Sequence, residues 1–392
     1  MNLDNNQQVF FELLRAGLFT EKELKSSIVQ QFKDVEWGKV YLLAQEQSVQ
    51  GLVLQGIEWF KNHNDNPNLD VNNIPQRLLL QWIGEVQMIE QRNKAMNLFV
   101  AELIEKLRKA DVYAILVKGQ GIARCYDKPL WRVCGDVDLL LSEDNYEKAK
   151  KVLLPLATSV ETEYTHFKHQ GMTIDGWVVE LHGTMHSRLT KRIDEALDHV
   201  QREVFFGGDV RSVEFKNSSG SSVPVFLPGE NCDVLFVFTH ILHHFFFEGI
   251  GLRQICDWCR LLWTFKDSLN IKLLESRISK MGLMSEWKAF AAVAVEYLGM
   301  PVEAMPLFNA NVDLNLNKNK ADRIMEFVLE VGNFGYKQRR DYSGQSYLMR
   351  KIKSSFRRLS DMLRHFSIFP KDSIIFFGGV LRSGMHAAVR GE

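Results

Sequence analysis

The sequence has few cysteines, five in 392 residues, at positions 125, 134, 232, 256 and 259. Their odd number in a long chain argues against a disulfide framework, so we expect reduced thiols. Cys256 and Cys259 form a C-x-x-C, but no second such pair is present to complete a zinc site. The surrounding residues have a helical pattern, so we predict that both thiols belong to the core.

The chain also has no charge excess and no long apolar run. Lys plus Arg equals Asp plus Glu at 48 each, which argues against bulk electrostatic attraction to nucleic acid or anionic membrane, although a local patch could survive. The longest uncharged run, 234–247, contains three histidines and is too short to span a bilayer. The first six residues are polar and lack the basic and apolar regions of a signal peptide. We therefore expect a cytoplasmic protein without a membrane span.

What is present predicts an α+β fold, in which a small mixed β-sheet is flanked by two helical regions. We expect a helical region at 1–95, a core at 96–227 and a helical domain at 228–392. The patterns predict helices at 78–110, 122–126, 145–156, 230–247 and 250–265, with more to about 366; strands at 114–117 and 136–141; a hairpin at 173–182; and loop with a short strand at 204–226, including a flexible stretch at 217–222.

The residues most suggestive of chemistry are Asp136 and Asp138, in the run Gly135-Asp136-Val137-Asp138. Side chains at i and i+2 of a strand point to the same face, about 6.6–7 Å apart at Cα. Both carboxylates could then converge on one metal ion or bridge two. Burying two like charges on an apolar strand is costly without a cation, and carboxylate oxygens with open positions suit Mg²⁺. A solvated strand end is the simpler alternative.

A third carboxylate, Glu180, lies on another apolar strand, where it could reach the same metals if the strands are neighbours. His182 points to the same face as Glu180, so we consider it a candidate for substrate contact. His166 and His169 have metal-ligand spacing only if helical, which the local pattern does not support. His240, His243 and His244 favour core or interface positions, though one of them could touch substrate.

The turn Lys118-Gly119-Gln120-Gly121 follows a strand and precedes a helix. Backbone N–H groups in such a turn can bind phosphate, glycine allows close approach, and Lys118 adds a positive charge. Arg132, four residues before Asp136, could form a bidentate contact with a phosphate or simply pair with a carboxylate. For Arg253 and Asp257, four residues apart, the expected arrangement is a pair within one helix.

Together, Leu-Val-Lys-Gly, then Tyr126, Pro129 and Arg132, then Gly-Asp-Val-Asp-Leu-Leu and Val-Glu-Leu-His resemble the bacterial family of uncharacterised nucleotidyltransferases, within the polymerase β-like superfamily. The histidines at 240–244 and the run 252–257 resemble the family's helical portion. The resemblance covers about 90–265, and its relatives include toxin-type nucleotidyltransferases with a similar Lys-Gly turn.

This resemblance implies that Asp136, Asp138 and Glu180 bind Mg²⁺ or Mn²⁺ and carry catalysis. It further implies that the turn holds the triphosphate of an NTP, with Lys118, Gly119, Gln120, Arg132 and Gly135 as the nucleotide-binding residues. The superfamily's usual Gly-Ser or Gly-Gly turn is here Gly119-Gln120, so a serine contact to phosphate is missing and Lys118 or Gln120 would replace it.

We therefore predict an enzyme that moves a nucleoside monophosphate from an NTP to a hydroxyl-bearing acceptor. The acceptor, which could be a small molecule, sugar, protein or RNA, is not determined by the sequence, nor is the oligomeric state. Three alternatives remain: a regulatory protein that binds nucleotide without chemistry, a toxin-type enzyme acting on RNA or protein, and a kinase-like reaction on the same scaffold. A basic stretch from Lys337 to Arg358 could bind RNA or a membrane, but a solvated face is favoured.

Overall fold

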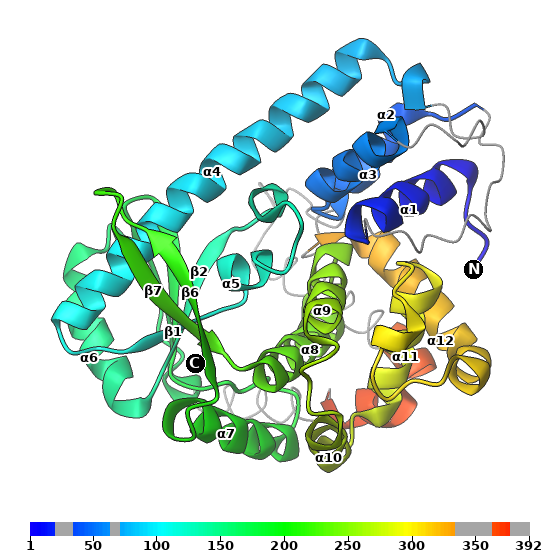
Figure 1. The fold of residues 1–392 in the computed structure, drawn as a ribbon. Helices are drawn as coiled ribbons and strands as arrows, with labels where there is room; N and C mark the ends of the chain where they lie inside the picture. Colours follow the sequence, from blue (N-terminus) through cyan, green and yellow to red (C-terminus); the bar gives the residue numbers. More distant parts are fainter. Residues whose placement is uncertain (20–33, 63–70, 334–362, 377–392) are drawn as a thin grey trace, which may run out of the picture.

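A computed structural model of the chain describes residues 1–19, 34–62, 71–333 and 363–376 (Figure 1). The helices are α1 (Asn5–Leu18), α2 (Trp37–Glu46), α3 (Gln50–Asn62), α4 (Gln76–Lys109), α5 (Gly119–Ala123), α6 (Glu143–Leu153), α7 (Lys191–Phe206), α8 (Glu230–Phe247), α9 (Leu252–Phe265), α10 (Ile271–Met281), α11 (Met284–Glu296) and α12 (Ala310–Val331). The strands are β1 (Ala114–Val117), β2 (Asp136–Leu141), β3 (Ser159–Val160), β4 (His169–Ile174), β5 (Trp177–His182), β6 (Val210–Lys216) and β7 (Ser222–Pro228).

The strands form one mixed sheet in the order β3-β4-β5-β2-β1-β7-β6, with β2 at its centre. On one side β2 pairs with β1 antiparallel, and on the other it pairs with β5 in parallel. Two antiparallel hairpins, β4–β5 and β6–β7, extend the sheet outward from this centre. With helices flanking the sheet, the fold is α+β, as the sequence predicted.

Alternation along β2 assigns its two faces to different environments. Val137, Leu139 and Leu141 belong to a hydrophobic cluster shared with residues of α4 and α6. Leu140 belongs instead to the larger cluster that contains residues of α1–α3, α8 and α9. Because Asp136 and Asp138 have the parity of Leu140, they lie on the face toward the helical region.

The long helix α4 connects the N-terminal helices to the sheet (Figure 1). In its first half Trp82 and Val86 belong to the larger, helical cluster, whereas from Met96 onward its buried residues belong to the sheet cluster. The change in packing falls between Val86 and Met96, and no break in the helix marks it.

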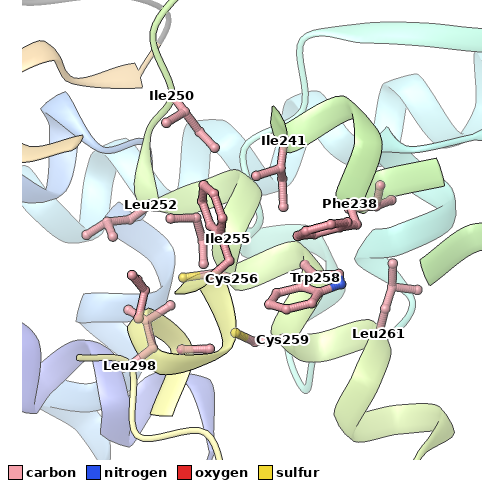
Figure 2. Close-up of a cluster of buried hydrophobic side chains, with 14 of the residues drawn as sticks. Phe238, Ile241, Ile250, Leu252, Ile255, Cys256, Trp258, Cys259, Leu261 and Leu298 are labelled. Atoms are coloured by element: carbon pink, nitrogen blue, oxygen red, sulfur yellow. The ribbon is translucent and has the colours of Figure 1, made fainter. Parts of the chain in front are cut away.

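Helix α9 lies within an apolar cluster shared with α8 and α11 (Figure 2). Cys256 and Cys259 are fully buried there, near Trp258 and Leu298. Burial in this cluster raises the pKa of both thiols. The prediction that this C-x-x-C belongs to the core is confirmed.

Most predicted elements are present with shifted ends. The strands at 114–117 and 136–141 and the helix at 230–247 match, and Asp175 and Gly176 form the predicted hairpin turn with φ of 50° and 80°. The helix predicted at 122–126 begins earlier, at Gly119. The predicted loop and short strand at 204–226 is wrong, because α7 extends to Phe206 and β6 and β7 form a complete hairpin closed by Asn217.

Two further predictions concern the membrane and the basic stretch. Within the described residues, no helix is both long and apolar enough to cross a bilayer. The basic residues between Lys337 and Arg358 lie outside the described residues.

Candidate active site

Three carboxylates converge on the helical face of the sheet. Asp136 and Asp138 are two residues apart on β2, and Asp138 lies directly opposite Glu180 of the parallel strand β5. Ligand oxygens of the three side chains all lie within 4.8 Å of one another. The strands are therefore neighbours, as the predicted metal site requires.

Two cationic side chains reach Asp138, which is 3% exposed. Lys118 donates to its Oδ1 from 2.9 Å, and Nε2 of His182 lies 2.8 Å from the same oxygen. His182 also lies 3.4 Å from Oε2 of Glu180, so it connects the two strands.

Glu180 has a second histidine partner that the sequence did not identify. His169 pairs directly with His182 across the β4–β5 hairpin, and its Nε2 lies 3.1 Å from Oε2 of Glu180. The signal was the strand register: a hairpin turn at Asp175-Gly176 places residues 169 and 182 opposite each other. The spacing of His166 and His169 indicates a metal ligand only in a helix, which the local pattern does not support, so it did not point to His169.

The electrostatics separate Asp136 from the other two carboxylates. Repulsion by Asp138, together with burial, raises the pKa of Asp136 to about 6. Burial also acts to raise the pKa of Asp138 and of Glu180, but Lys118 and the histidines outweigh it and hold both below their usual range.

The same neighbours shift the pKa values of Lys118 and His182 upward. Burial alone would lower the pKa of Lys118 and of His182, but the adjacent carboxylates raise both pKa values. Asp138 and Glu180 thus have side-chain hydrogen-bond partners, whereas Asp136 has no hydrogen-bond or ion-pair partner among the described residues.

An unpartnered carboxylate facing two others fits a divalent cation. The donor set is three carboxylates, the hard oxygen ligands that Mg²⁺ and Mn²⁺ take in proteins. A cation beside Asp136 would remove the repulsion that raises its pKa. The residues present therefore fit the metal that the sequence led us to expect.

The predicted phosphate turn has a strained backbone next to Asp136. Lys118 has φ 56° and ψ −144°, a region that residues other than glycine rarely occupy. Gly119 follows with φ 31°, and a Cβ placed there would lie 3.4 Å from the carbonyl oxygen of Asp136. The turn therefore holds the ammonium of Lys118 over Asp138 and brings the backbone of Gly119 close to β2.

Arg132 and Gln120 are engaged elsewhere. Arg132 is 8% exposed and forms a bidentate ion pair with Asp257 of α9, with Nε and Nη2 at 2.7 and 2.6 Å from its oxygens. Gln120 is buried and donates to Oδ1 of Asn93 on α4. Because these groups are already bound inside the protein, neither is placed to bind a triphosphate beside the carboxylates.

The expected pair within α9 is replaced by this longer-range one. Asp257 also accepts a hydrogen bond from the hydroxyl of Tyr126 at 2.6 Å, so its carboxylate serves Tyr126 and Arg132. Arg253 instead donates to the carbonyl of Val133 at 2.8 Å. Both contacts attach the segment that precedes Gly135 and Asp136 to α9.

A pocket of about 210 Å³ opens beside Glu180 and Lys118. Its walls come from β5, the segment after β5, and α8. Histidines dominate the lining, at positions 169, 182, 186, 240, 243 and 244. The sequence pattern favoured core or interface positions for His240, His243 and His244, with one of them as a candidate for substrate contact. The structure places all three at this pocket.

The chain thus has a seven-stranded mixed sheet in an α+β core, with two aspartates on its central strand and a third carboxylate beside them, a donor set that fits a divalent cation. The model of a family described as uncharacterised nucleotidyltransferase matches residues 33–299. The chain belongs to this family, as its sequence motifs suggested. Searches of curated proteins and of solved structures found no match.

Proposed function

We propose that the protein transfers a nucleoside monophosphate from an NTP to a hydroxyl of an acceptor and releases pyrophosphate. The convergence of Asp136, Asp138 and Glu180 from two neighbouring strands carries this proposal. Membership in a nucleotidyltransferase family supports an NTP as the donor.

The three carboxylates would hold Mg²⁺ or Mn²⁺, which when bound neutralises charge on the transferring phosphoryl group and lowers the pKa of the acceptor hydroxyl. Lys118 would place its ammonium near the phosphates, since it already lies at the edge of the carboxylate cluster. Gly119 and Gly135 would leave backbone space for the triphosphate, because no side chain projects from either. Arg132 and Gln120 would support the site from behind.

The test is incubation with each labelled NTP and Mg²⁺ or Mn²⁺, with mass spectrometry of any modified acceptor. An added nucleotide supports transfer, and an added phosphate indicates kinase-like chemistry instead. Asp136→Asn should abolish the reaction, with Asp144→Asn, an exposed aspartate on α6, as the matched control.

The same experiment separates the alternatives. Tight NTP binding without turnover, identical in wild type and Asp136→Asn, would indicate a nucleotide-binding regulator. Labelling of RNA or of a protein in a lysate would indicate a toxin-type enzyme.

A further inference from the structure

The acceptor side of the site has a chain of close polar contacts that the three carboxylates do not explain. His240 and His244 are one turn apart on α8, and their Nε2 atoms lie 2.9 Å from each other. Nδ1 of His244 lies 2.7 Å from Oε2 of Glu248. Three titratable groups thus form a line along one wall of the pocket, and all three contribute to its lining.

The positions of the protons along this line follow from Glu248. A carboxylate only accepts hydrogen bonds, so a contact of 2.7 Å requires a proton on Nδ1 of His244. A neutral His244 then has a bare Nε2, which must accept a proton from Nε2 of His240 across 2.9 Å. A neutral His240 in this tautomer has an unprotonated Nδ1.

The charge states support this assignment. Burial, together with Lys118, lowers the pKa of His240 well below its usual value, and burial also lowers the pKa of His244. Hydrogen bonds from His243 and His244 lower the pKa of Glu248, which keeps it ionised. Both histidines in the line are therefore neutral near pH 7.

The charged groups around His240 either disfavour its protonation or are already paired with another residue. A charged His240 is disfavoured by Lys118 in the turn after β1, by His182 of β5, and by His243 and His244 of its own helix. Lys118 and His182 are bonded to Asp138, and Glu248 lies beyond His244. Among the described residues, no hydrogen bond occupies Nδ1 of His240.

Glu180, by contrast, is poorly placed to take a proton from the acceptor. Both His169 and His182 direct a ring nitrogen at its Oε2. In the proposed site Glu180 also holds the metal, whose positive charge makes this carboxylate a still weaker base. The pocket therefore needs another base, and His240 supplies a nitrogen lone pair.

We propose that this histidine pocket binds the acceptor and that His240 is the general base of the transfer, with His244 and Glu248 as positioning residues. The inference rests on the proposed function. Nδ1 of His240 removes the proton of the acceptor hydroxyl as its oxygen bonds to the α-phosphorus of the NTP. The bond from that phosphorus to the bridging oxygen breaks, and pyrophosphate leaves with the electron pair. His240 becomes cationic and later releases its proton to water.

Arg188 defines the chemical class of the acceptor. It lines the pocket, and its guanidinium lies 4.5 and 5.1 Å from the ring centroids of Phe167 and Tyr164. No carboxylate pairs with it among the described residues, unlike Lys118 and Arg132. Its φ of 59° is costly for a side chain other than glycine, and such strain is common at ligand sites. A guanidinium held by aromatic rings and without a counter-ion suits an anion.

The volume limits the size of that anion. The pocket has a volume of about 210 Å³, below the range of about 300–1,000 Å³ that is usual for sites that bind drug-sized ligands. The acceptor is thus a small molecule that carries both a hydroxyl and a phosphate or carboxylate, with the anion at Arg188 and the hydroxyl at His240.

The first experiment measures the tautomers in the full-length protein by nitrogen NMR of ¹⁵N-histidine, with His240 assigned from His240→Gln. We expect a bare Nδ1 and a protonated Nε2 on His240 at pH 7. Glu248→Ala should mix the two tautomers, whereas Glu275→Ala, which removes an exposed glutamate of α10, should not. A protonated Nδ1 on His240 in the wild type would overturn the assignment of the base.

The second experiment measures binding of glycerol 3-phosphate, glycerate and glycerol by calorimetry. We expect at least one of the two anions to bind at least tenfold more tightly than glycerol, and their ratio shows whether phosphate or carboxylate is preferred. Arg188→Ala should remove that advantage, and Arg202→Ala, at an exposed arginine of α7, should keep it. Equal binding of all three compounds, or an unchanged advantage in Arg188→Ala, would overturn the anionic class.

Kinetics then distinguish this inference from the proposed function. His240→Gln should lower NTP turnover at least 100-fold, as loss of a general base does, and should flatten the acid limb of the pH profile without weakening NTP binding. The control is His199→Gln, at an exposed histidine of α7. Full turnover in His240→Gln with none in Asp136→Asn would refute the base alone. Absence of turnover in the wild type with every NTP would refute the proposed function, while NMR and calorimetry still test the pocket.

Discussion

Arg132 and Asp257 form a buried, bidentate ion pair that connects the segment before β2 to helix α9. Both side chains are almost inaccessible to solvent, at 6% and 5%. Tyr126 donates to the same carboxylate, so two motif residues upstream of Asp136 meet on one helical residue. The sequence motif suggested that Arg132 contacts phosphate. In the structure Arg132 instead connects the segment before the aspartate strand β2 to α9.

Breaking this pair should destabilise the fold. We expect Arg132→Met to cost about 3–5 kcal/mol in the free energy of unfolding, because Asp257 would be left buried without its counter-ion. The double variant Arg132→Met with Asp257→Leu should recover a large part of that loss, since it leaves no buried charge unpaired. Urea unfolding of the single and double variants measures both values, and a double variant no more stable than Arg132→Met would contradict this account.

The raised pKa of Asp136 predicts a specific pH dependence. A carboxyl whose pKa rises on folding stabilises the folded state when protonated, so the metal-free protein should lose this contribution as pH increases from about 4 to about 6. Asp136→Asn carries no such charge. Its stability relative to wild type should therefore increase across that window, in urea unfolding with EDTA present, and Asp144→Asn should show no such increase.

Without metal at pH 7, Asp136→Asn should be more stable than the wild type, and bound metal should reverse this order. Mg²⁺ or Mn²⁺ at about 100 times its Kd should stabilise the wild type by about 2.7 kcal/mol, and should leave Asp136→Asn nearly unchanged. Thermal melts with and without metal at pH 7 provide the measurement. An equal rise in Tm for both proteins would show that the cation binds somewhere else.

Two substitutions at Lys118 distinguish the effect of its charge from the effect of its strained backbone. Lys118→Met and Lys118→Gly both remove the ammonium from Asp138, but only glycine adopts φ 56° and ψ −144° without strain. We expect Lys118→Gly to be more stable than Lys118→Met by about 1–2 kcal/mol, although both should lose activity.

The control for this comparison is Lys151, an exposed residue of the regular helix α6. There glycine should be less stable than methionine by a little under 1 kcal/mol, which is the opposite order. Chemical unfolding of the four variants decides the question, and the same order at both positions would show that residue 118 is not strained.

How much of the site the sequence predicted depends on how local each signal is. Asp136 and Asp138 share a strand with continuous apolar neighbours, so their common face followed from alternation alone. That Glu180 lies opposite Asp138 required β2 and β5 to pair, and strand order depends on packing across the whole domain. The motif resemblance implied that Glu180 is the third carboxylate of the site, but the pairing of the two strands is shown only by the structure.

The missed features have physical reasons of the same kind. The roles of Arg132 and Gln120 depended on which side of the turn faces the sheet, and their partners Asp257 and Asn93 lie far away in the sequence. Strand β6 was not separated from the predicted loop and short strand because only Val213 and Phe215 of its residues pack into the sheet cluster, which leaves a short apolar pattern. The histidine pocket joins β5 to α8, a contact that local periodicity does not indicate.

The buried C-x-x-C gives a prediction about reactivity. Cys256 and Cys259 are fully buried, and burial raises the pKa of both thiols, so neither should form the thiolate that reacts with alkylating agents or binds zinc. Iodoacetamide at pH 8 should leave both unmodified in the folded protein and should modify all five cysteines after denaturation. Peptide mass spectrometry gives the extent at each site, with Ser276→Cys on the exposed face of α10 as the reactive reference. If either thiol of the folded protein reacted as fast as that reference, α9 would have to open in the native state. The ion pair between Arg132 and Asp257 would then break transiently as well.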